Sequence, residues 1–223
     1  MKPQDRENIL YKTGKRVQIN EEEKILIKKF EKLYTNKKIK ALDVGCGSGE
    51  IMEILNNYGC ITTGIDFSSE AINICEKKNL DAKQADLDSG INIDDNFFDM
   101  VWAGDVIEHV FDPLFLIKEL SRIIKTNGYI FFSIPNDLHI SKRITTLMGE
   151  SYQYSYYKKF GIYKHHSFFS LNLLNYFFKK NKLEILDLNR IIRIPKINRK
   201  FILKGSFFDL FAMAYFGVAK KND

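Results

Sequence analysis

Three alternate glycines, Gly45, Gly47 and Gly49, break an apolar run in the first quarter of the chain. Glycine lets the backbone turn sharply and approach a ligand closely, and a helix that follows such a turn presents free N–H groups to that ligand. The run carries an acidic residue, Asp43, and its spacing differs from the Gly-x-Gly-x-x-Gly of dinucleotide sites. The turn therefore predicts a nucleotide-type ligand without a pyrophosphate. The alternative is a turn that serves only tight packing of a strand on a helix.

Carboxylates recur where the next predicted strands end. The stretch 60–66 is a second apolar strand that ends in Asp66, about twenty residues beyond the glycines, where an acidic side chain can accept hydrogen bonds from ribose hydroxyls. A third short segment ends at Asp86, and a fourth strand ends at Asp105. We expect Asp66 to bind a ribose, whereas Asp86 is either a ligand contact or a turn residue.

The chain has four histidines, His109, His139, His165 and His166, and histidine suits proton transfer near neutral pH. His109 follows Glu108 just beyond the fourth strand, at the carboxyl edge where open sheets bind ligands. We expect His109 to take part in removing a proton from an acceptor hydroxyl. The alternative is a loop histidine that hydrogen-bonds to the backbone.

Five segments resemble, in order and spacing, those of the class I S-adenosylmethionine-dependent methyltransferases: LDVGCGSGE, GIDFS, ADLD, FDMVWAGDVIEHV and GYIFFSIPN. The resemblance covers about residues 38–190. It implies an α/β fold with a doubly wound, seven-stranded, mostly parallel, Rossmann-like sheet and a last antiparallel strand. It also implies S-adenosylmethionine as cofactor, with Asp66 on the ribose and Phe67 against the adenine. The cofactor residues implied are Asp43, Gly45, Gly47, Gly49, Asp66, Phe67, Asp86, Leu87 and Gly104.

The elements that must position these residues follow from hydrophobic periodicity. Residues 20–35 carry apolar side chains at helical spacing and predict a helix that covers one side of the cofactor cleft. Ser68 and Asp112 are predicted to cap two later helices. Asn127-Gly128 is predicted to end the helix after the fourth strand, ahead of a fifth strand over 129–134.

Length and composition agree with one catalytic domain. The 223 residues fit a single domain, 1–223, with an N-terminal helical extension over 1–37. We find neither the apolar core of a signal peptide nor an apolar stretch long enough to cross a bilayer, and so expect a cytoplasmic protein. Three cysteines without Cys-x-x-Cys spacing predict neither disulfides nor a thiolate zinc site. The net charge of +6 decides little, and no nucleic-acid partner is expected.

A long segment, 136–167, separates the fifth strand from a predicted helix near Leu171 and is rich in tyrosines. Long insertions at the ligand edge usually carry specificity, so we expect an aromatic cap over the site of a small-molecule acceptor. The alternative is a surface insertion whose aromatic rings pack on one another. The stretch HHSFFS, starting at His165, resembles the His-x-x-Phe-Phe-Ser/Thr stretch of methyltransferases from bacterial glycan clusters. That resemblance implies a hydroxylated acceptor, with His165 as the second catalytic histidine beside His109.

Asp105, Glu108 and His109, followed at a distance by His165, resemble the Glu-x-x-Glu-His arrangement of ubiquinone-pathway and small-RNA 2′-O-methyltransferases. Such oxygen and imidazole groups could hold Mg²⁺ or a transition metal, which would lower the proton affinity of an acceptor hydroxyl. The first acid is Asp here, with a shorter reach than Glu. We therefore expect a site without metal and keep these four residues as the metal-binding alternative.

An insertion over 190–211 is predicted ahead of a final strand over 212–219. Within it, residues 190–204 combine basic and isoleucine-rich apolar positions without an acidic residue. Such a segment could make peripheral contact with an anionic membrane surface or with phosphate groups, or could be a solvated face.

We expect an S-adenosylmethionine-dependent O-methyltransferase of a hydroxylated small molecule, namely a sugar, a nucleotide-linked sugar or a related envelope-glycan precursor. A quinone- or polyprenyl-type acceptor is the runner-up, favoured if the cap binds an apolar tail. An RNA methyltransferase and a non-catalytic cofactor-binding module are further alternatives, because one fold supports many functions.

Overall fold

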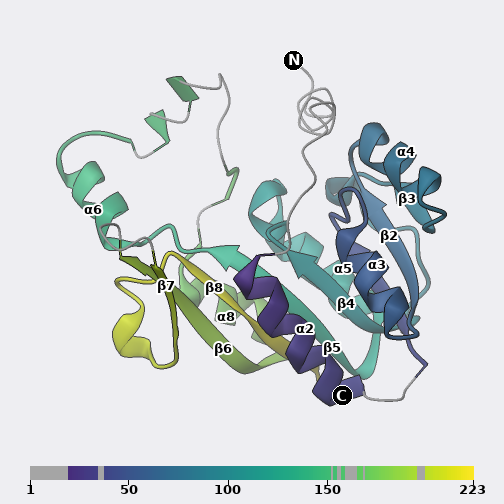
Figure 1. Ribbon diagram of the computed structural model, residues 1–223. Helices are drawn as coiled ribbons and strands as arrows, with labels where there is room; N and C mark the ends of the chain where they lie inside the picture. Colours follow the sequence, from purple (N-terminus) through teal and green to yellow (C-terminus); the bar gives the residue numbers. More distant parts are fainter. Residues whose placement is uncertain are drawn as a thin grey trace.

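The computed structural model describes residues 20–34, 38–151, 153–154, 157–158, 165–167, 169–194 and 199–223. In these residues eight strands form one sheet (Figure 1). The strands are β1 (Lys40–Val44), β2 (Ile61–Asp66), β3 (Ala82–Gln84), β4 (Phe98–Gly104), β5 (Ile124–Pro135), β6 (Leu183–Ile194), β7 (Arg199–Leu203) and β8 (Ala214–Lys221). Their spatial order is β3-β2-β1-β4-β5-β8-β6-β7. The first five strands are parallel to one another, whereas β8 is antiparallel to β5 and β6.

This architecture confirms the predicted fold class, and it differs from the prediction by one strand. The insertion predicted over 190–211 does not leave the sheet at residue 190. Instead β6 continues to Ile194 and pairs antiparallel with β7, which becomes the outermost strand. The physical reason is the isoleucine-rich sequence of this stretch, because β-branched side chains favour extended backbone and the hairpin supplies its hydrogen bonds.

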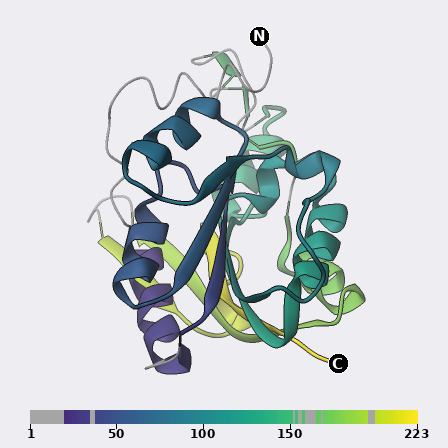
Figure 2. The ribbon, with the colours of Figure 1, turned by 90° about the vertical axis from the view of Figure 1, so that its right-hand side faces the viewer.

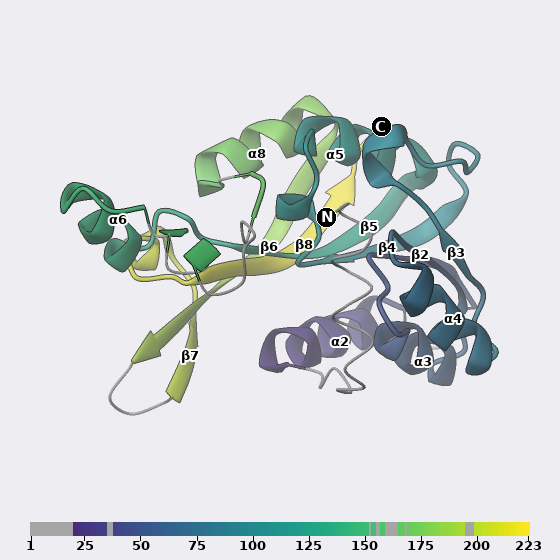
Figure 3. The same cartoon turned by 90° about the horizontal axis from the view of Figure 1, so that it is seen from above.

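Helices cover both faces of the sheet. They are α2 (Glu21–Tyr34), α3 (Glu50–Asn57), α4 (Ser69–Lys77), α5 (Pro113–Ile123), α6 (Ile140–Leu147) and α8 (Leu171–Lys180), with short 3₁₀ turns η1 (Leu87–Ser89), η2 (Ile107–His109) and η3 (Ser206–Phe208). α2 and α3 lie on one face and α5 on the other (Figure 2). Seen from above, α8 lies on the same face of the sheet as α5, while α6 lies apart, near the end of the sheet that carries β7 (Figure 3).

Each face has its own hydrophobic core. Leu116 and Leu120 of α5 and Phe178 of α8 pack in the larger cluster, together with strand residues such as Phe132. The opposite cluster contains Leu26 and Phe30 of α2, Leu55 of α3, and the stacked rings of Trp102 and Phe131. Burial on both faces is the pattern expected of a parallel sheet, and it fixes the positions at which the strands end.

The predicted helix starts are confirmed. α2 spans Glu21–Tyr34, within the predicted 20–35, and begins with a capping box in which Asn20 and Glu23 exchange backbone-to-side-chain hydrogen bonds of 2.8 and 2.7 Å. The Ser68 hydroxyl accepts from the Ala71 N–H, and the Asp112 carboxylate accepts from the Phe115 N–H. These caps satisfy backbone donors that the first helical turn leaves without partners.

The predicted end of α5 is wrong by four residues. The helix stops at Ile123, and Asn127 and Gly128 lie inside β5 rather than between helix and strand. They form an irregular turn at which the pairing of β5 with β4 shifts register. Asn127 has a φ of +64°, and a Cβ at position 128 would lie 2.8 Å from the Lys125 carbonyl oxygen. An Asn-Gly pair suits this bend for the same reason that it suits a helix end, so local sequence did not distinguish the two.

The basic side chains of 190–204 that the structure describes have acidic partners. Arg190 forms a 2.5 Å ion pair with Asp209, Lys200 pairs with Glu22 at 2.9 Å, and Lys204 pairs with Asp187 at 2.9 Å. Lys196 lies outside the described residues. The peripheral membrane contact suggested for this segment remains a prediction, and these intramolecular pairs weaken its electrostatic argument.

The expected cap, 136–167, contains α6, none of whose residues is buried. Tyr154 and Tyr157 are exposed, and Tyr152, Tyr156 and Tyr163 lie outside the described residues, so a cap over the acceptor remains a prediction. In the part of the chain that the structure describes, no helix is long and apolar enough to cross a membrane.

Candidate active site

The glycine turn lies at the carboxyl end of β1 and is attached to β2. The N–H groups of Gly45 and Cys46 both donate to the Ile65 carbonyl oxygen, at 2.8 and 3.1 Å. Gly45, Gly47 and Gly49 have φ values of +69°, +54° and +85°, which side chains rarely tolerate. A Cβ on Gly45 would lie 3.0 Å from Val106, and one on Gly49 would lie 2.3 Å from Leu80. The turn therefore needs glycine both for its conformation and for close packing.

Asp66 ends β2 and holds the glycine turn in place. Its Oδ2 accepts a 2.9 Å hydrogen bond from the Gly47 N–H, and its Oδ1 accepts one of 2.8 Å from the Ser68 N–H. Burial raises the pKa of this carboxyl, and the backbone hydrogen bonds offset only part of that effect. The predicted ribose-binding acid thus lies directly against the predicted cofactor turn.

Asp43 lies within β1 and is buried. Its Oδ2 has no hydrogen-bond partner among the described residues. Burial raises its pKa well above the ordinary value, and the negative charges of Asp66, Glu23 and Glu50 add to the effect. Several carboxyl groups therefore act on one another around the glycine turn. Such a region favours a ligand that carries positive charge, because a cation would relieve their mutual repulsion.

The remaining predicted cofactor residues differ in their surroundings. Phe67 is half-buried and lies outside the three hydrophobic clusters of the described residues, which disfavours a pure core role. Asp86 is exposed and caps η1, accepting from the Asp88 N–H at 3.0 Å and the Ser89 hydroxyl at 3.1 Å. Leu87 belongs to a core cluster, and a Cβ on Gly104 would lie 2.9 Å from Trp102. The turn role of Asp86 is observed, whereas the adenine contacts remain predictions.

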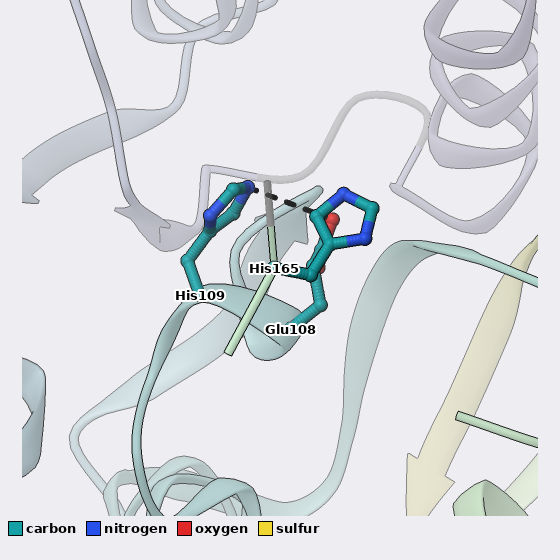
Figure 4. A group of neighbouring side chains, drawn as sticks. All are labelled: Glu108, His109 and His165. Atoms are coloured by element: carbon teal, nitrogen blue, oxygen red, sulfur yellow. Dashed lines mark ion pairs between the residues drawn. The ribbon is translucent and has the colours of Figure 1, made fainter. Parts of the chain in front are cut away.

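Glu108, His109 and His165 converge, although His165 comes from a distant part of the chain (Figure 4). One donor atom of each residue lies within 4.8 Å of the other two. His109 Nε2 is 3.8 Å from Glu108 Oε1, and the two imidazole rings meet nearly at right angles with centroids 5.4 Å apart. Glu108 and His165 are buried, whereas the His109 side chain is 39% exposed. We call these three residues the histidine cluster.

Backbone and side-chain hydrogen bonds join the two chain segments that form the histidine cluster. The N–H groups of His166 and Ser167 both donate to the Glu108 carbonyl oxygen, at 3.0 and 3.1 Å. The buried Gln153 side chain donates to the His165 carbonyl oxygen at 3.2 Å. Backbone hydrogen bonds therefore hold the segments of His109 and His165 together, so the proximity of the two histidines does not depend on their side chains alone.

Other predicted candidates lie outside the cluster. Asp105 has a φ of +51°, is exposed, and accepts a 2.7 Å hydrogen bond from the Ser133 hydroxyl. Of the four residues in the predicted metal pattern, it is the one that the convergent group does not include. His139 caps α6, and the His166 ring lies 4.7 Å from Phe111.

Asp137 was missed by the sequence analysis. It follows β5 and is buried, with its Oδ1 3.7 Å from His165 Nδ1 and 2.7 Å from the Lys142 ammonium. Its Oδ2 accepts a 3.1 Å hydrogen bond from the Phe169 N–H. Burial alone would raise its pKa, but the interactions with His165 and Lys142 outweigh burial and lower the pKa to about 2. One signal was available, because Asp137 follows its strand closely, as the acids of the earlier strands do.

The sheet is an open α/β sheet that carries a glycine turn after its first strand and an acid at the end of its second. A comparison with protein families agrees with this fold. Residues 42–132 match the family model described as a methyltransferase domain. The chain is a class I S-adenosylmethionine-dependent methyltransferase, and S-adenosylmethionine is its cofactor. The recognition made from the sequence motifs is confirmed.

Curated relatives include enzymes named ubiquinone biosynthesis O-methyltransferase. The protein of that name from Coxiella burnetii (strain RSA 493 / Nine Mile phase I) is 29% identical over 180 residues, covering 78% of this chain and 76% of its own length. The one from Pasteurella multocida (strain Pm70) is 34% identical over 119 residues, covering 44% and 46%.

Solved structures share the fold. An S-adenosylmethionine-dependent methyltransferase from Methanosarcina mazei has a TM-score of 0.63 at 20% identity, covering 86% of this chain and 97% of its own. A putative sarcosine dimethylglycine methyltransferase from Galdieria sulphuraria has a TM-score of 0.66 at 17% identity, covering 90% and 85%. At identities this low, the similarity shows a common fold.

The residues present fit S-adenosylmethionine. The Gly45 and Gly49 positions hold backbone where a side chain would collide, and the buried Asp43 oxygen has capacity for a donor. The acidic surroundings of Asp43 and Asp66 suit a cofactor with a sulfonium and an ammonium group.

Proposed function

We propose that the protein methylates a hydroxyl oxygen of a small molecule and that the histidine cluster receives the hydroxyl proton. The observation that carries the proposal is the convergence of His165 on Glu108 and His109 of η2, which follows β4, the strand that pairs with β1. Bound S-adenosylmethionine supplies an electrophilic methyl group. The protein then has to align the acceptor, exclude water and remove one proton.

The three residues of the histidine cluster divide this task. An imidazole accepts the proton of the hydroxyl, and the electron pair of the O–H bond stays on the oxygen that forms the bond to the methyl carbon. The carboxylate of Glu108, 3.8 Å from His109, stabilises positive charge on the imidazoles. The second imidazole orients the acceptor hydroxyl.

The relatives named ubiquinone biosynthesis O-methyltransferase favour an aromatic, quinone-type acceptor. The acceptor that was the runner-up in the sequence analysis is therefore the one we propose. The sugar or envelope-glycan acceptor gains no support from these comparisons.

A labelled-methyl transfer assay tests the proposed function. Extract from cells that lack the protein should contain the unmethylated acceptor, and the purified protein with labelled S-adenosylmethionine should label a low-molecular-weight phenolic fraction. A catechol with an apolar tail and a simple sugar serve as paired authentic acceptors. Label in the sugar fraction would restore the glycan acceptor, and label in RNA would point to a nucleic-acid substrate. Cofactor binding without any transfer would leave a binding module.

The same three residues also form a donor set for a divalent cation, because two imidazole nitrogens and one carboxylate oxygen suit Mg²⁺ or a transition metal. Such an ion would be held by Glu108, His109 and His165 and would lower the pKa of a bound hydroxyl. We propose the site without metal, since Asp105 is turned to Ser133 and leaves three donors in place of four.

Chelation with EDTA should leave the rate unchanged. A loss of activity that Mg²⁺ or Mn²⁺ restores would reverse this assignment.

A further inference from the structure

We propose that Asp137 is a positioning residue that holds His165 with its proton on Nδ1, which makes Nε2 the atom that accepts the proton of the acceptor hydroxyl. The inference deepens the proposed function and rests on it. It assigns the role of base to His165 and a role in the reaction to a residue that no motif singled out.

The geometry of the imidazole supports this assignment. His165 Nδ1 is buried and makes no direct hydrogen bond within the described part of the chain, and the Asp137 carboxylate lies 3.7 Å away. A shift of about 0.5 Å would bring the two atoms into hydrogen-bonding distance. A carboxylate can only accept, so the neutral imidazole must carry its proton on Nδ1 to use this partner. Nε2 is then the ring nitrogen with a lone pair.

Asp137 is itself held rigidly. Its Oδ2 accepts from the Phe169 N–H at 3.1 Å, its own N–H donates to the Phe169 carbonyl oxygen at 3.4 Å, and Lys142 of α6 lies 2.7 Å from its Oδ1. It also follows β5, one of the five parallel strands whose carboxyl ends meet at the active-site edge. A carboxylate fixed at a strand end can orient an imidazole without moving during the reaction.

The proton transfer balances as follows. The O–H bond of the acceptor breaks, its proton forms an N–H bond at His165 Nε2, and the electron pair remains on the oxygen. As that oxygen bonds to the methyl carbon, the bond from the methyl carbon to sulfur breaks, and its electron pair leaves with the sulfur of S-adenosylhomocysteine. The resulting imidazolium keeps its Nδ1 proton and faces the Asp137 carboxylate, which stabilises the new positive charge. Release of the proton to solvent returns His165 to the neutral form.

The test compares Asp137→Asn with Lys142→Met. In Asp137→Asn the amide oxygen can still accept from Phe169, but the amide NH₂ faces His165 and favours the opposite tautomer. We expect turnover to fall by about a hundredfold or more with little change in S-adenosylmethionine affinity. Lys142→Met removes the other partner of the same carboxylate but keeps the acceptor for His165 Nδ1–H, so it should lower turnover far less than Asp137→Asn does.

The readout that separates positioning from a structural role is the tautomer of His165. Long-range ¹H–¹⁵N NMR spectra of the unliganded protein, with the signal assigned through His165→Gln, should show Nδ1–H in the wild type and in Lys142→Met. They should show Nε2–H in Asp137→Asn. This measurement needs no acceptor, so it stands even if the acceptor or the reaction has been assigned wrongly.

Two results would overturn the proposal: a wild-type His165 with its proton on Nε2, or near-normal turnover in an Asp137→Asn variant whose tautomer has changed. If Asp137→Asn does not fold, the double variant Asp137→Asn/Lys142→Met removes the contact between the amide NH₂ and the ammonium group. It should show the same tautomer and the same loss of turnover.

Discussion

The two parts of the active-site edge are built differently. On the cofactor side, the ends of β1 and β2 hold the glycine turn through short connections, such as the hydrogen bond from Gly47 to Asp66. On the acceptor side, His165 reaches Glu108 across a long stretch of chain, and α6 has no buried residue. A buried parallel sheet fixes its strand ends, whereas an excursion is held by only a few specific bonds. We infer that changes on the acceptor side alter turnover more than stability, and that changes on the cofactor side alter both.

The largest expected effect is on turnover and comes from the histidine cluster. His109→Asn and His165→Asn should each lower turnover by about a hundredfold or more, because general-base assistance and acceptor alignment are lost. S-adenosylmethionine affinity should stay nearly unchanged. Steady-state kinetics and calorimetry provide the two measurements.

His139→Asn is the matched control for these two variants. His139 lies outside the cluster, and asparagine can also cap a helix, so turnover should stay normal. Near-normal turnover in both His109→Asn and His165→Asn would mean that alignment alone drives the transfer. The acceptor side would then differ from the cofactor side in structure but not in its effect on turnover.

The next effect is on cofactor affinity. Asp66→Ala should weaken S-adenosylmethionine binding by about 1–3 kcal/mol, or roughly 5- to 150-fold in Kd, because ribose hydroxyls lose a charged acceptor and the glycine turn loses its anchor. Asp86→Ala provides the comparison, since its exposed carboxylate already bonds within η1, and the loss should be smaller. Calorimetry that gave equal affinities for wild type and Asp66→Ala, or preferential NAD binding, would contradict the cofactor assignment.

Sequence reasoning succeeded where short-range chemistry decides the structure. Helix caps such as Ser68 and the glycine turn depend on residues a few positions apart, and the parallel strands follow from continuous apolar runs. It fell short where a local pattern fits two geometries, as Asn127-Gly128 does, or where a partner comes from elsewhere in the fold. Asp137 belongs to the second kind, because nothing near it in sequence indicates that Phe169 and His165 will lie beside it.

A smaller effect, on stability, should come from Asp43. Burial and neighbouring acids raise its pKa in the folded protein above the ordinary 3.8, so the folded state holds a proton that the unfolded state releases. Between these two pKa values the folded protein therefore loses stability as pH rises. Asp43→Asn removes this penalty, so the variant should melt at a higher temperature than the wild type at neutral pH without cofactor. A gain of 1 kcal/mol corresponds to about 2–4 °C for a chain of this size.

The same substitution should weaken S-adenosylmethionine binding, because asparagine cannot ionise to the buried carboxylate that a cationic ligand favours. Thermal melts across the acid-to-neutral range, with and without cofactor, measure both effects. A melting temperature that falls in Asp43→Asn without ligand would show that the ionised carboxylate stabilises the empty site. The acidic residues around the glycine turn would then not destabilise the folded protein.

The smallest effect is expected at the C-terminal end of α6, where Leu147 is the last helical residue and Met148 follows it. Leu147 is 86% exposed and Met148 is 78% exposed, so replacing both with serine removes almost no buried apolar area. Their double replacement should change the free energy of unfolding by no more than about 0.5 kcal/mol. By contrast, Phe178→Ala in the fully buried face of α8 should cost about 3–5 kcal/mol. Urea denaturation of both variants gives the comparison directly.

If the α6 double variant lost stability on the scale of Phe178→Ala, its apolar face would be covered in solution. This part of the acceptor side would then contribute to the core in the same way as α8.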